Sequence, residues 1–199
     1  MITVRGSNAA RERRFIGGLS SGIDRAHQRA INDTGFDVRK DLIQSMKATF
    51  ESPTPFTLRS IFVDKARGPS LSASVRVLPR QAEYLGIQQR GGQRTAYNEW
   101  IIIPADGTRR NRYGNLTKRA RQKLFDDPRN YIIESNPSTA VIYQRRARNS
   151  KRIAVLKKVT RYKKNWPFFA IAHNSAVKHY PIRLNERLNA LERRVRRQR

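Results

Sequence analysis

Residues 71–77 read Leu-Ser-Ala-Ser-Val-Arg-Val, and apolar and polar side chains alternate along this stretch. A period of two is typical of a β-strand with one face on a core and the other face in water. Residues 57–63 have a similar strand-forming composition, and residues 65–69 between the two runs have the composition of a hairpin loop. We therefore expect β-structure to begin soon after residue 56.

More strand candidates follow toward the carboxyl end, at residues 100–103, 139–143 and 153–159. Residues 82–87 are ambiguous between helix and strand. Residues 116–125 predict a short helix, because Thr117 stands where a hydroxyl can cap the first turn. The middle of the chain is therefore expected to form a mostly antiparallel sheet.

Helical patterns flank this region. In the first 50 residues, apolar side chains recur at steps of three and four, which predicts an amphipathic helix. Gly17, Gly18 and Gly35 leave open whether it is one helix or two, and Pro53 with Pro55 ends it.

A second helical pattern runs from residue 168 to residue 195, with Asn165 as its expected cap. Pro181 is expected to kink or split this helix near Val177. The sequence thus predicts an α+β fold with a long N-terminal helix, a mostly antiparallel β-sheet and a C-terminal helix packed on it. We expect one domain over residues 1–199. Its parts are an N-terminal helical segment (1–51), a β-rich basic body with long loops (52–164) and a C-terminal helix (165–199).

The chain of 199 residues carries 42 basic and 15 acidic side chains, which gives a net charge of +27. Residues 1–51 hold only +3 of this charge, and no acidic residue occurs between Ser135 and Asn185. Such an excess of positive charge attracts polyanions, of which nucleic acid is the most common in cells. A solvated basic surface without a partner is the alternative.

The composition excludes several classes of protein. Cysteine is absent, so the chain has no disulfide framework, zinc–thiolate site, iron–sulfur cluster or thiol nucleophile. The longest apolar runs are too short to span a bilayer, and no charged-then-apolar signal segment is evident at residue 1. We therefore expect the protein in a cytosol, or in a particle assembled in one.

No catalytic constellation is evident. His27, His173 and His179 are far apart in the sequence and match no metal-binding motif. Asp126 and Asp127 could form a nuclease-like metal site with Glu134, but adjacent aspartates before a proline more often mark a helix end. We therefore expect a protein that is not an enzyme and has no cofactor or metal.

The positive signal is the density of basic residues in two segments. At such density they can neutralise phosphates and release counterions, and they equally suit an acidic protein surface. No recognition helix, aromatic RNA-binding motif or zinc finger accompanies them, so contacts with nucleic acid are expected at the backbone. The candidate contacts are Arg109, Arg110, Arg112, Lys118, Arg119, Arg121, Lys123, Arg145, Arg146, Arg148, Lys151, Arg152, Lys157, Lys158, Arg161, Lys163 and Lys164.

The order of several short motifs resembles the bacteriophage minor tail protein Z family, the tail-completion proteins of long-tailed phages. The motifs lie at residues 30–39, 53–60, 84–86, 91–92, 111–116, 168–169 and 188–192, and they span most of the chain. The resemblance carries over no catalytic residue, because the family has no sharp active-site signature.

The resemblance implies a virion protein of the neck or tail top, assembled in the host cytoplasm and acting in tail completion and head–tail joining. Its copies would form a ring around the DNA channel, with basic loops facing DNA or acidic neighbours. The implied partners are further copies of this chain, a tail terminator, the tail tube, the connector and genomic DNA, with no membrane contact. The expected subunit-packing residues are Ile16, Leu19, Ile23, Leu184, Leu188 and Leu191.

Two other functions stay open at this point. One is a free nucleic-acid-binding protein, for instance of the ribosome-associated type, which binds through phosphate contacts as a monomer. The other is the metal-dependent nuclease built on Asp126, Asp127 or Glu134.

Overall fold

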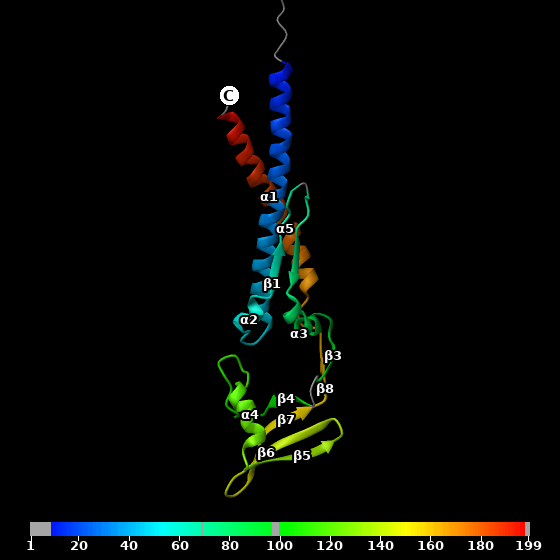
Figure 1. The fold of residues 1–199 in the computed structure, drawn as a ribbon, viewed down its shortest axis with the longest axis vertical. Helices are drawn as coiled ribbons and strands as arrows, with labels where there is room; N and C mark the ends of the chain where they lie inside the picture. The colour runs from blue at the N-terminus through cyan, green and yellow to red at the C-terminus, as the bar shows by residue number, and fades with distance from the viewer. Residues whose placement is uncertain (1–8, 69, 97–99, 198–199) are drawn as a thin grey trace, which may run out of the picture. The chain divides into compact units, whose positions relative to one another are not determined.

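The computed structural model describes residues 9–68, 70–96 and 100–197, and it describes side chains from residue 17 onward (Figure 1). The chain divides into two compact units. Unit 1 contains residues 1–45, 59–78 and 168–199, and unit 2 contains residues 46–58 and 79–167. Neither unit is continuous in the sequence, and the N-terminal helix belongs to both.

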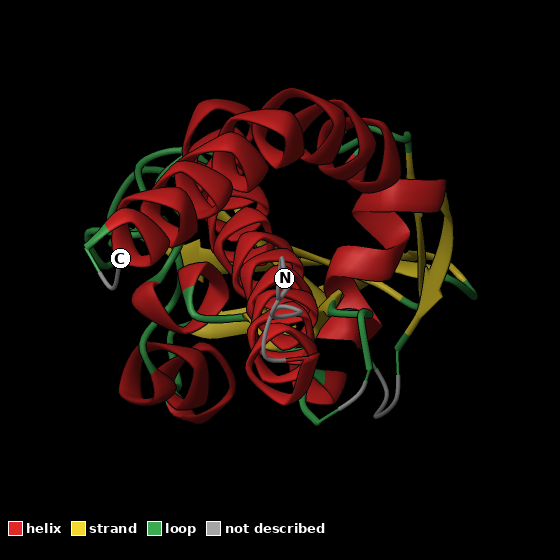
Figure 2. Cartoon of the chain, turned by 90° about the horizontal axis from the view of Figure 1, so that it is seen from above, coloured by secondary structure: helices red, strands yellow, loops and turns green. Residues whose placement is uncertain are grey.

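Unit 1 consists of two long helices and a β-ladder. The helices are α1 (Ala9–Thr49), of which unit 1 contains the part up to residue 45, and α5 (Phe168–Arg196). The ladder consists of strands β1 (Ile61–Asp64) and β2 (Ser74–Val77), which pair antiparallel. Helices α1 and α5 lie side by side (Figures 1 and 2). A Cβ atom at Gly35 would lie 2.9 Å from Cγ1 of Val63, so glycine allows α1 to approach β1 closely.

A ladder of polar pairs joins α1 to α5. Three aspartates four residues apart on α1 meet side chains four residues apart on α5, which is the register of two antiparallel helices. The pairs are Asp33 with Arg187 (2.6 Å), Asp37 with Arg183 (2.7 Å) and Asp41 with His179 (3.2 Å). Ser175 also donates a hydrogen bond to Asp41 (2.7 Å). These carboxylates are therefore engaged inside unit 1.

The Asp37 pair makes unit 1 sensitive to acid. The hydrogen bond from the Arg183 guanidinium is the largest cause that lowers the pKa of Asp37, and the positive charge of Arg183 adds to it. A carboxylate with a lowered pKa in the folded state stabilises the fold above its unfolded pKa of about 3.9, and it loses this effect as pH falls through the folded pKa. The contribution of Asp37 should therefore be complete at pH 7 and should fade below about pH 4.

We expect Asp37→Asn to remove this part of the pH dependence. Urea unfolding followed by far-UV circular dichroism at pH 7 and pH 3 measures it, because α1 and α5 provide most of the helical signal. Asp24→Asn is the control, since Asp24 is exposed and has no ion pair among the described residues. If Asp37→Asn loses as much stability on acidification as the parent chain, the Asp37–Arg183 pair is not a source of acid sensitivity.

Unit 2 contains helices α2 (Pro55–Leu58), α3 (Pro79–Arg90) and α4 (Lys118–Asp126). Strands β3 (Gly92–Thr95) and β8 (Val159–Tyr162) form a two-stranded antiparallel ladder. Four more strands form one antiparallel sheet in the order β4-β7-β6-β5. They are β4 (Ile101–Pro104), β5 (Asn130–Asn136), β6 (Thr139–Arg145) and β7 (Ser150–Lys157).

The core of the four-stranded sheet lies on the face that α4 covers. It consists of Leu124 from α4 with Ala140, Ile142, Ile153, Ala154 and Leu156 from the two central strands, and Trp100, Ile102 and Leu116 pack against it. A separate aromatic contact within unit 2 joins Phe50 to the fully buried Trp166, with ring centroids 5.9 Å apart.

The predicted α+β fold with antiparallel sheets is confirmed, and α5 packs on α1 and on the β1–β2 ladder. The short helix capped by Thr117 is confirmed, because the Thr117 hydroxyl accepts a hydrogen bond from the N–H of Ala120 (3.1 Å). The open question at the N-terminus is answered by one helix, since α1 continues through its glycines.

Several local predictions are wrong. Residues 57–63 do not form one strand, because α2 ends at Leu58 and β1 begins at Ile61. Asn165 does not cap α5, which begins three residues later; its N–H instead donates to the carbonyl of Gln88 (2.9 Å). Of the two outcomes expected at Pro181, a kink or a split, the split is excluded, because α5 continues past this proline and its later part is tied to α1 by Arg183 and Arg187. Strands β3 and β5 have no counterpart among the predicted elements.

Candidate nucleic-acid interface

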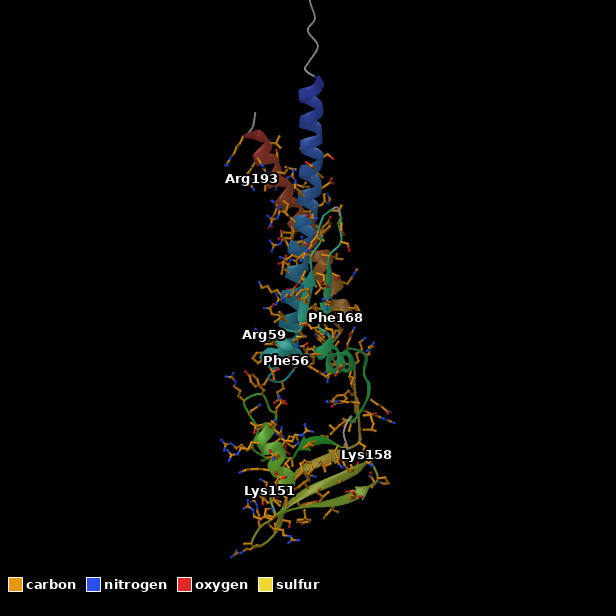
Figure 3. All side chains as sticks on the ribbon, viewed as in Figure 1. Phe56, Arg59, Lys151, Lys158, Phe168 and Arg193 are labelled. Carbon is orange, nitrogen blue, oxygen red and sulfur yellow. The ribbon has the colours of Figure 1, made fainter. Side chains whose placement is uncertain are left out.

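Six basic side chains of unit 2 line one hollow of about 710 Å³ at the end of the four-stranded sheet, beside α4. They come from five places: the loop after β4, α4, the turn before β5, the turn after β6, and β7. We call this site the basic hollow and define its basic residues as Arg109, Arg119, Lys123, Arg129, Arg146 and Lys151. Figure 3 shows Lys151 and Lys158 at opposite ends of β7, and only Lys151 belongs to the hollow.

Helix α4 is held over the sheet at both ends. Thr117 caps its start, and the buried Leu124 anchors it in the core. At its end, the side-chain amide of Asn130 donates to the carbonyls of Lys123 (3.2 Å) and Leu124 (3.1 Å). Arg119 and Lys123 are four residues apart and therefore share one face of α4, which lines the hollow.

One carboxylate lies in the hollow, and an arginine neutralises it. The Arg129 guanidinium donates to Asp127 at 2.8 and 3.0 Å, and the Arg129 backbone N–H donates to it at 3.0 Å. These hydrogen bonds, with the side chain as the larger cause, lower the pKa of Asp127 to about 2. Asp127 is therefore ionised at neutral pH and balances Arg129.

The other basic groups of the hollow keep their charge uncompensated. The side chains of Arg109, Arg119 and Arg146 form no hydrogen bond or ion pair with any described residue. Lys151 donates to the carbonyl of Gly107 (3.2 Å), which orients its ammonium but leaves the charge. Lys123 lies near enough to Asp127 to add to the lowering of that pKa. The hollow is thus strongly positive, with its donors facing solvent.

The structure brings five of the predicted contact residues together in the hollow: Arg109, Arg119, Lys123, Arg146 and Lys151. It does not bring the other twelve into it. Those are Arg110, Arg112, Lys118, Arg121, Arg145, Arg148, Arg152, Lys157, Lys158, Arg161, Lys163 and Lys164.

Some of these twelve have structural roles instead. Arg110 donates to the carbonyl of Pro104 (3.0 Å), which fixes the loop after β4. Arg112 lies over the ring of Tyr113, with its guanidinium carbon 4.8 Å from the ring centroid. Arg145 lies over Tyr131 at 5.4 Å in the same manner. These cation–π contacts orient Arg112 and Arg145 against tyrosine rings, and both arginines keep their charge.

Sequence reasoning missed Arg129. It stands alone between Pro128 and Asn130, outside the two basic runs, and the reading of Asp126 and Asp127 as a helix end gave no role to the arginine that follows. The signal that could have found it is the spacing Asp-Pro-Arg after a helix. An aspartate at a helix end can accept hydrogen bonds from the residue two positions later.

This arrangement suits an anion that accepts hydrogen bonds at several points. Arginine presents planar donors to phosphate oxygens, and lysine adds point charges. In the described part of the chain, no group of three His, Cys, Asp or Glu side chains could hold a metal ion, so the structure adds no support to the nuclease alternative. In those ranges no helix is long and apolar enough to cross a membrane.

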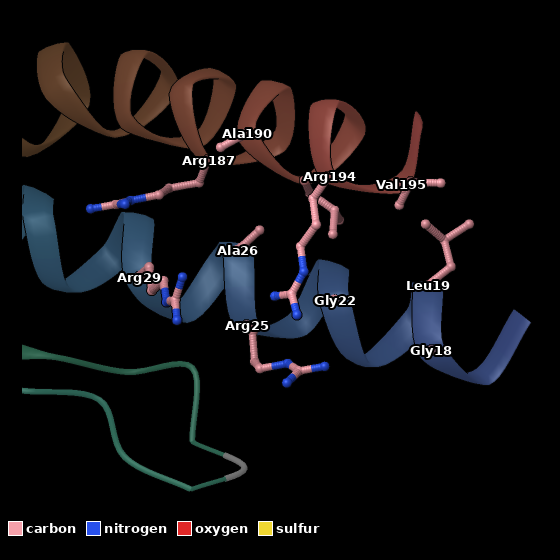
Figure 4. A pocket seen from close by; sticks show the side chains of 11 residues that line it. Gly18, Leu19, Gly22, Arg25, Ala26, Arg29, Arg187, Ala190, Arg194 and Val195 are labelled. Atoms are coloured by element: carbon pink, nitrogen blue, oxygen red, sulfur yellow. The ribbon is translucent and has the colours of Figure 1, made fainter. Parts of the chain in front are cut away.

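The predicted subunit-packing residues lie mainly along α1 and α5. Between the helices is a groove of about 400 Å³ that Leu19, Leu191 and Val195 line together with four arginines (Figure 4). A Cβ atom at Gly22 would lie 2.9 Å from Cδ1 of Leu191, so Leu191 packs on α1 of its own chain.

The other packing residues differ in exposure. Ile23 is 38% exposed, and Leu184 and Leu188 are half-buried. The side chain of Ile16 lies outside the described residues. A contact of these residues with another copy stays a prediction.

Comparison with known proteins gives no relative: no family model, no curated protein and no solved structure matches this chain.

Proposed function

We propose that this protein is a non-enzymatic structural protein of a phage neck or tail top, which acts in tail completion and binds the backbone of genomic DNA through the basic hollow. The observation that carries DNA binding is the convergence of Arg109, Arg119 and Arg146 on one hollow without an acidic partner among the described residues. The proposed location in a virion rests on the order of the short sequence motifs that resemble the minor tail protein Z family.

Geometry favours phosphate over base contacts. The donors of the hollow come from loops, a helix flank and a strand end, whereas a reading motif presents the side chains of one helix to the base edges. Phosphate contacts carry no sequence information, which suits a protein that must hold any stretch of a genome as it passes. An acidic surface of a neighbouring virion protein would use the same charges and is the second outcome of the test.

Mass spectrometry and immunogold electron microscopy of purified virions test the proposal. We expect the chain in mature particles, with label at the junction of head and tail. Absence of the chain from mature virions, together with salt-sensitive DNA binding by an isolated monomer, would instead support the free nucleic-acid-binding protein. Photo-crosslinking from a probe at Arg146 in the virion distinguishes DNA from an acidic neighbour.

A further inference from the structure

Strand β5 is an outer strand of the four-stranded sheet, and within the described residues it pairs only with β6. An outer strand presents unpaired N–H and C=O groups to any chain that can form the next ladder. Proteins commonly protect such an edge with lysine, proline or a bulge. Residues 130–136 contain no basic residue and no proline, and the irregularity in pairing falls only at the end, between Glu134 and Asn136.

The register shows which backbone groups point outward from β5. The N–H of Arg145 donates to the carbonyl of Arg129 (2.8 Å), so the polar groups of Arg129 face β6. Backbone direction alternates along an antiparallel strand. The polar groups of Tyr131 and Ile133 therefore also face β6. Those of Ile132 and Glu134 point to the open side, as does the carbonyl of Asn130, whose N–H donates to the carbonyl of Asp127 (2.9 Å).

The opposite edge of the sheet is protected. The N–H of Ala105 donates to the carbonyl of Ile153 in β7 (3.0 Å), so the outward residues of β4 are Ile102 and Pro104. Pro104 has no N–H, and its carbonyl accepts a hydrogen bond from Arg110 (3.0 Å). Only Ile102 keeps free outward groups on β4, which disfavours head-to-tail joining of β5 to β4.

Two apolar side chains of β5 are also exposed to solvent in a single copy of the chain. Ile132 and Ile133 are each 48% exposed and lie on opposite faces of the sheet. No basic side chain of β5 itself lies beside either isoleucine to keep a second copy away. In a chain with a net charge of +27, residues 130–136 carry one acidic and no basic side chain, so two copies can meet along this edge without placing positive charges opposite one another.

We propose that two copies of this chain join through β5, antiparallel about a two-fold axis at Ile132, into one continuous sheet. An axis at Ile132 centres the ladder on a residue whose N–H and C=O point outward, so that the two Ile132 residues exchange both hydrogen bonds. In this register Ile132 lies opposite Ile132 of the other copy, Asn130 lies opposite Glu134, and Tyr131 lies opposite Ile133. Each exposed isoleucine thus gains an apolar cross-strand neighbour. The N–H and C=O groups of Ile132 find partners in the other copy, and the N–H of Glu134 donates to the carbonyl of Asn130, whose own N–H already donates to Asp127.

Sedimentation velocity of the full chain at about 0.5 M salt, where screening shortens the reach of surface charge to about 4 Å, tests this pairing. We expect a dimer at rising protein concentration. Ile132→Pro should abolish it, because the lost N–H points outward and no ladder bond to β6 is removed. Ile132→Lys should abolish it too, should the proline variant not fold. Ile103→Lys, at a 36% exposed isoleucine of β4, is the matched control and should still dimerise.

Oxidative cross-linking tests the register, because the chain has no cysteine of its own. Ile132→Cys should form a cross-linked dimer, since Cα atoms of a directly opposed pair lie about 5.5 Å apart, within disulfide range. Ser135→Cys should not, because its two copies would lie six residues apart along the ladder, about 20 Å. A monomer at every concentration, or a dimer that survives both Ile132 variants, would overturn the proposal. These outcomes do not depend on whether the protein belongs to a phage neck.

Discussion

Replacing Leu156 by alanine is expected to lower the free energy of unfolding of unit 2 by about 2–5 kcal/mol. Leu156 is fully buried in β7, between Ala140 of β6 and Ile102 of β4. Both neighbouring strands are fixed by the sheet, so they can collapse only partly into the space that the leucine leaves. The cost therefore includes a cavity as well as the lost burial.

Tryptophan fluorescence during urea unfolding measures this effect. The chain has two tryptophans, Trp100 and Trp166, and both belong to unit 2. Val155→Ala is the matched control, because Val155 adjoins Leu156 but faces the other side of the sheet and is only half-buried. A loss at Leu156 no larger than the loss at Val155 would mean that the α4 face does not hold the core of this sheet.

Reversing three charges of the basic hollow, in the combined variant Arg119→Glu, Arg146→Glu and Lys151→Glu, is expected to weaken binding to duplex DNA at least about 100-fold near physiological salt. Each phosphate contact contributes through the counterions that it releases, and the variant removes three such contacts and adds repulsion. The fold should persist, because exposed substitutions such as those at Arg119 and Arg146 cost about 0.5 kcal/mol or less, and half-buried Lys151 loses one hydrogen bond to a loop carbonyl, worth about 0.5–1.5 kcal/mol.

The control for this variant changes the net charge by the same amount in unit 1. Arg59→Glu, Lys178→Glu and Arg193→Glu alter exposed residues outside the hollow, and Figure 3 labels Arg59 and Arg193. If binding follows only the total charge, both variants weaken equally. We expect the control to lose less than about 10-fold, because only the long-range attraction falls.

Local signals in the sequence predicted some elements well. The Thr117 hydroxyl, placed before a short apolar pattern, was enough to locate α4, because a cap acts within one turn. Strand β5 escaped prediction since Ile132 and Ile133 stand side by side, whereas alternation is the usual mark of a half-buried strand. Gly35 looked like a weak point of the helix, yet it allows contact with Val63, which only the tertiary structure reveals.

For the candidate site, too, the sequence predicts local features and not the contacts between distant segments. The sequence shows dense basic runs, but not which members converge. Arg109 and Lys151 meet because β4 and β7 pair, and Arg146 joins them through the turn between β6 and β7. Arg112 and Arg145 belong to the same runs and lie over tyrosines instead. The pairing of the strands determines which basic side chains line the hollow and which lie elsewhere, and the composition of the sequence carries no information about strand register.

The salt dependence of DNA binding by the full chain, measured by fluorescence anisotropy with a labelled duplex, tests most directly whether the basic hollow holds phosphates. With five side chains engaged besides the ion-paired Arg129, the logarithm of the binding constant should fall with the logarithm of salt at a slope of about −4.5, and the triple hollow variant should show about −1.8. The same slope for both chains would contradict a phosphate site in the hollow.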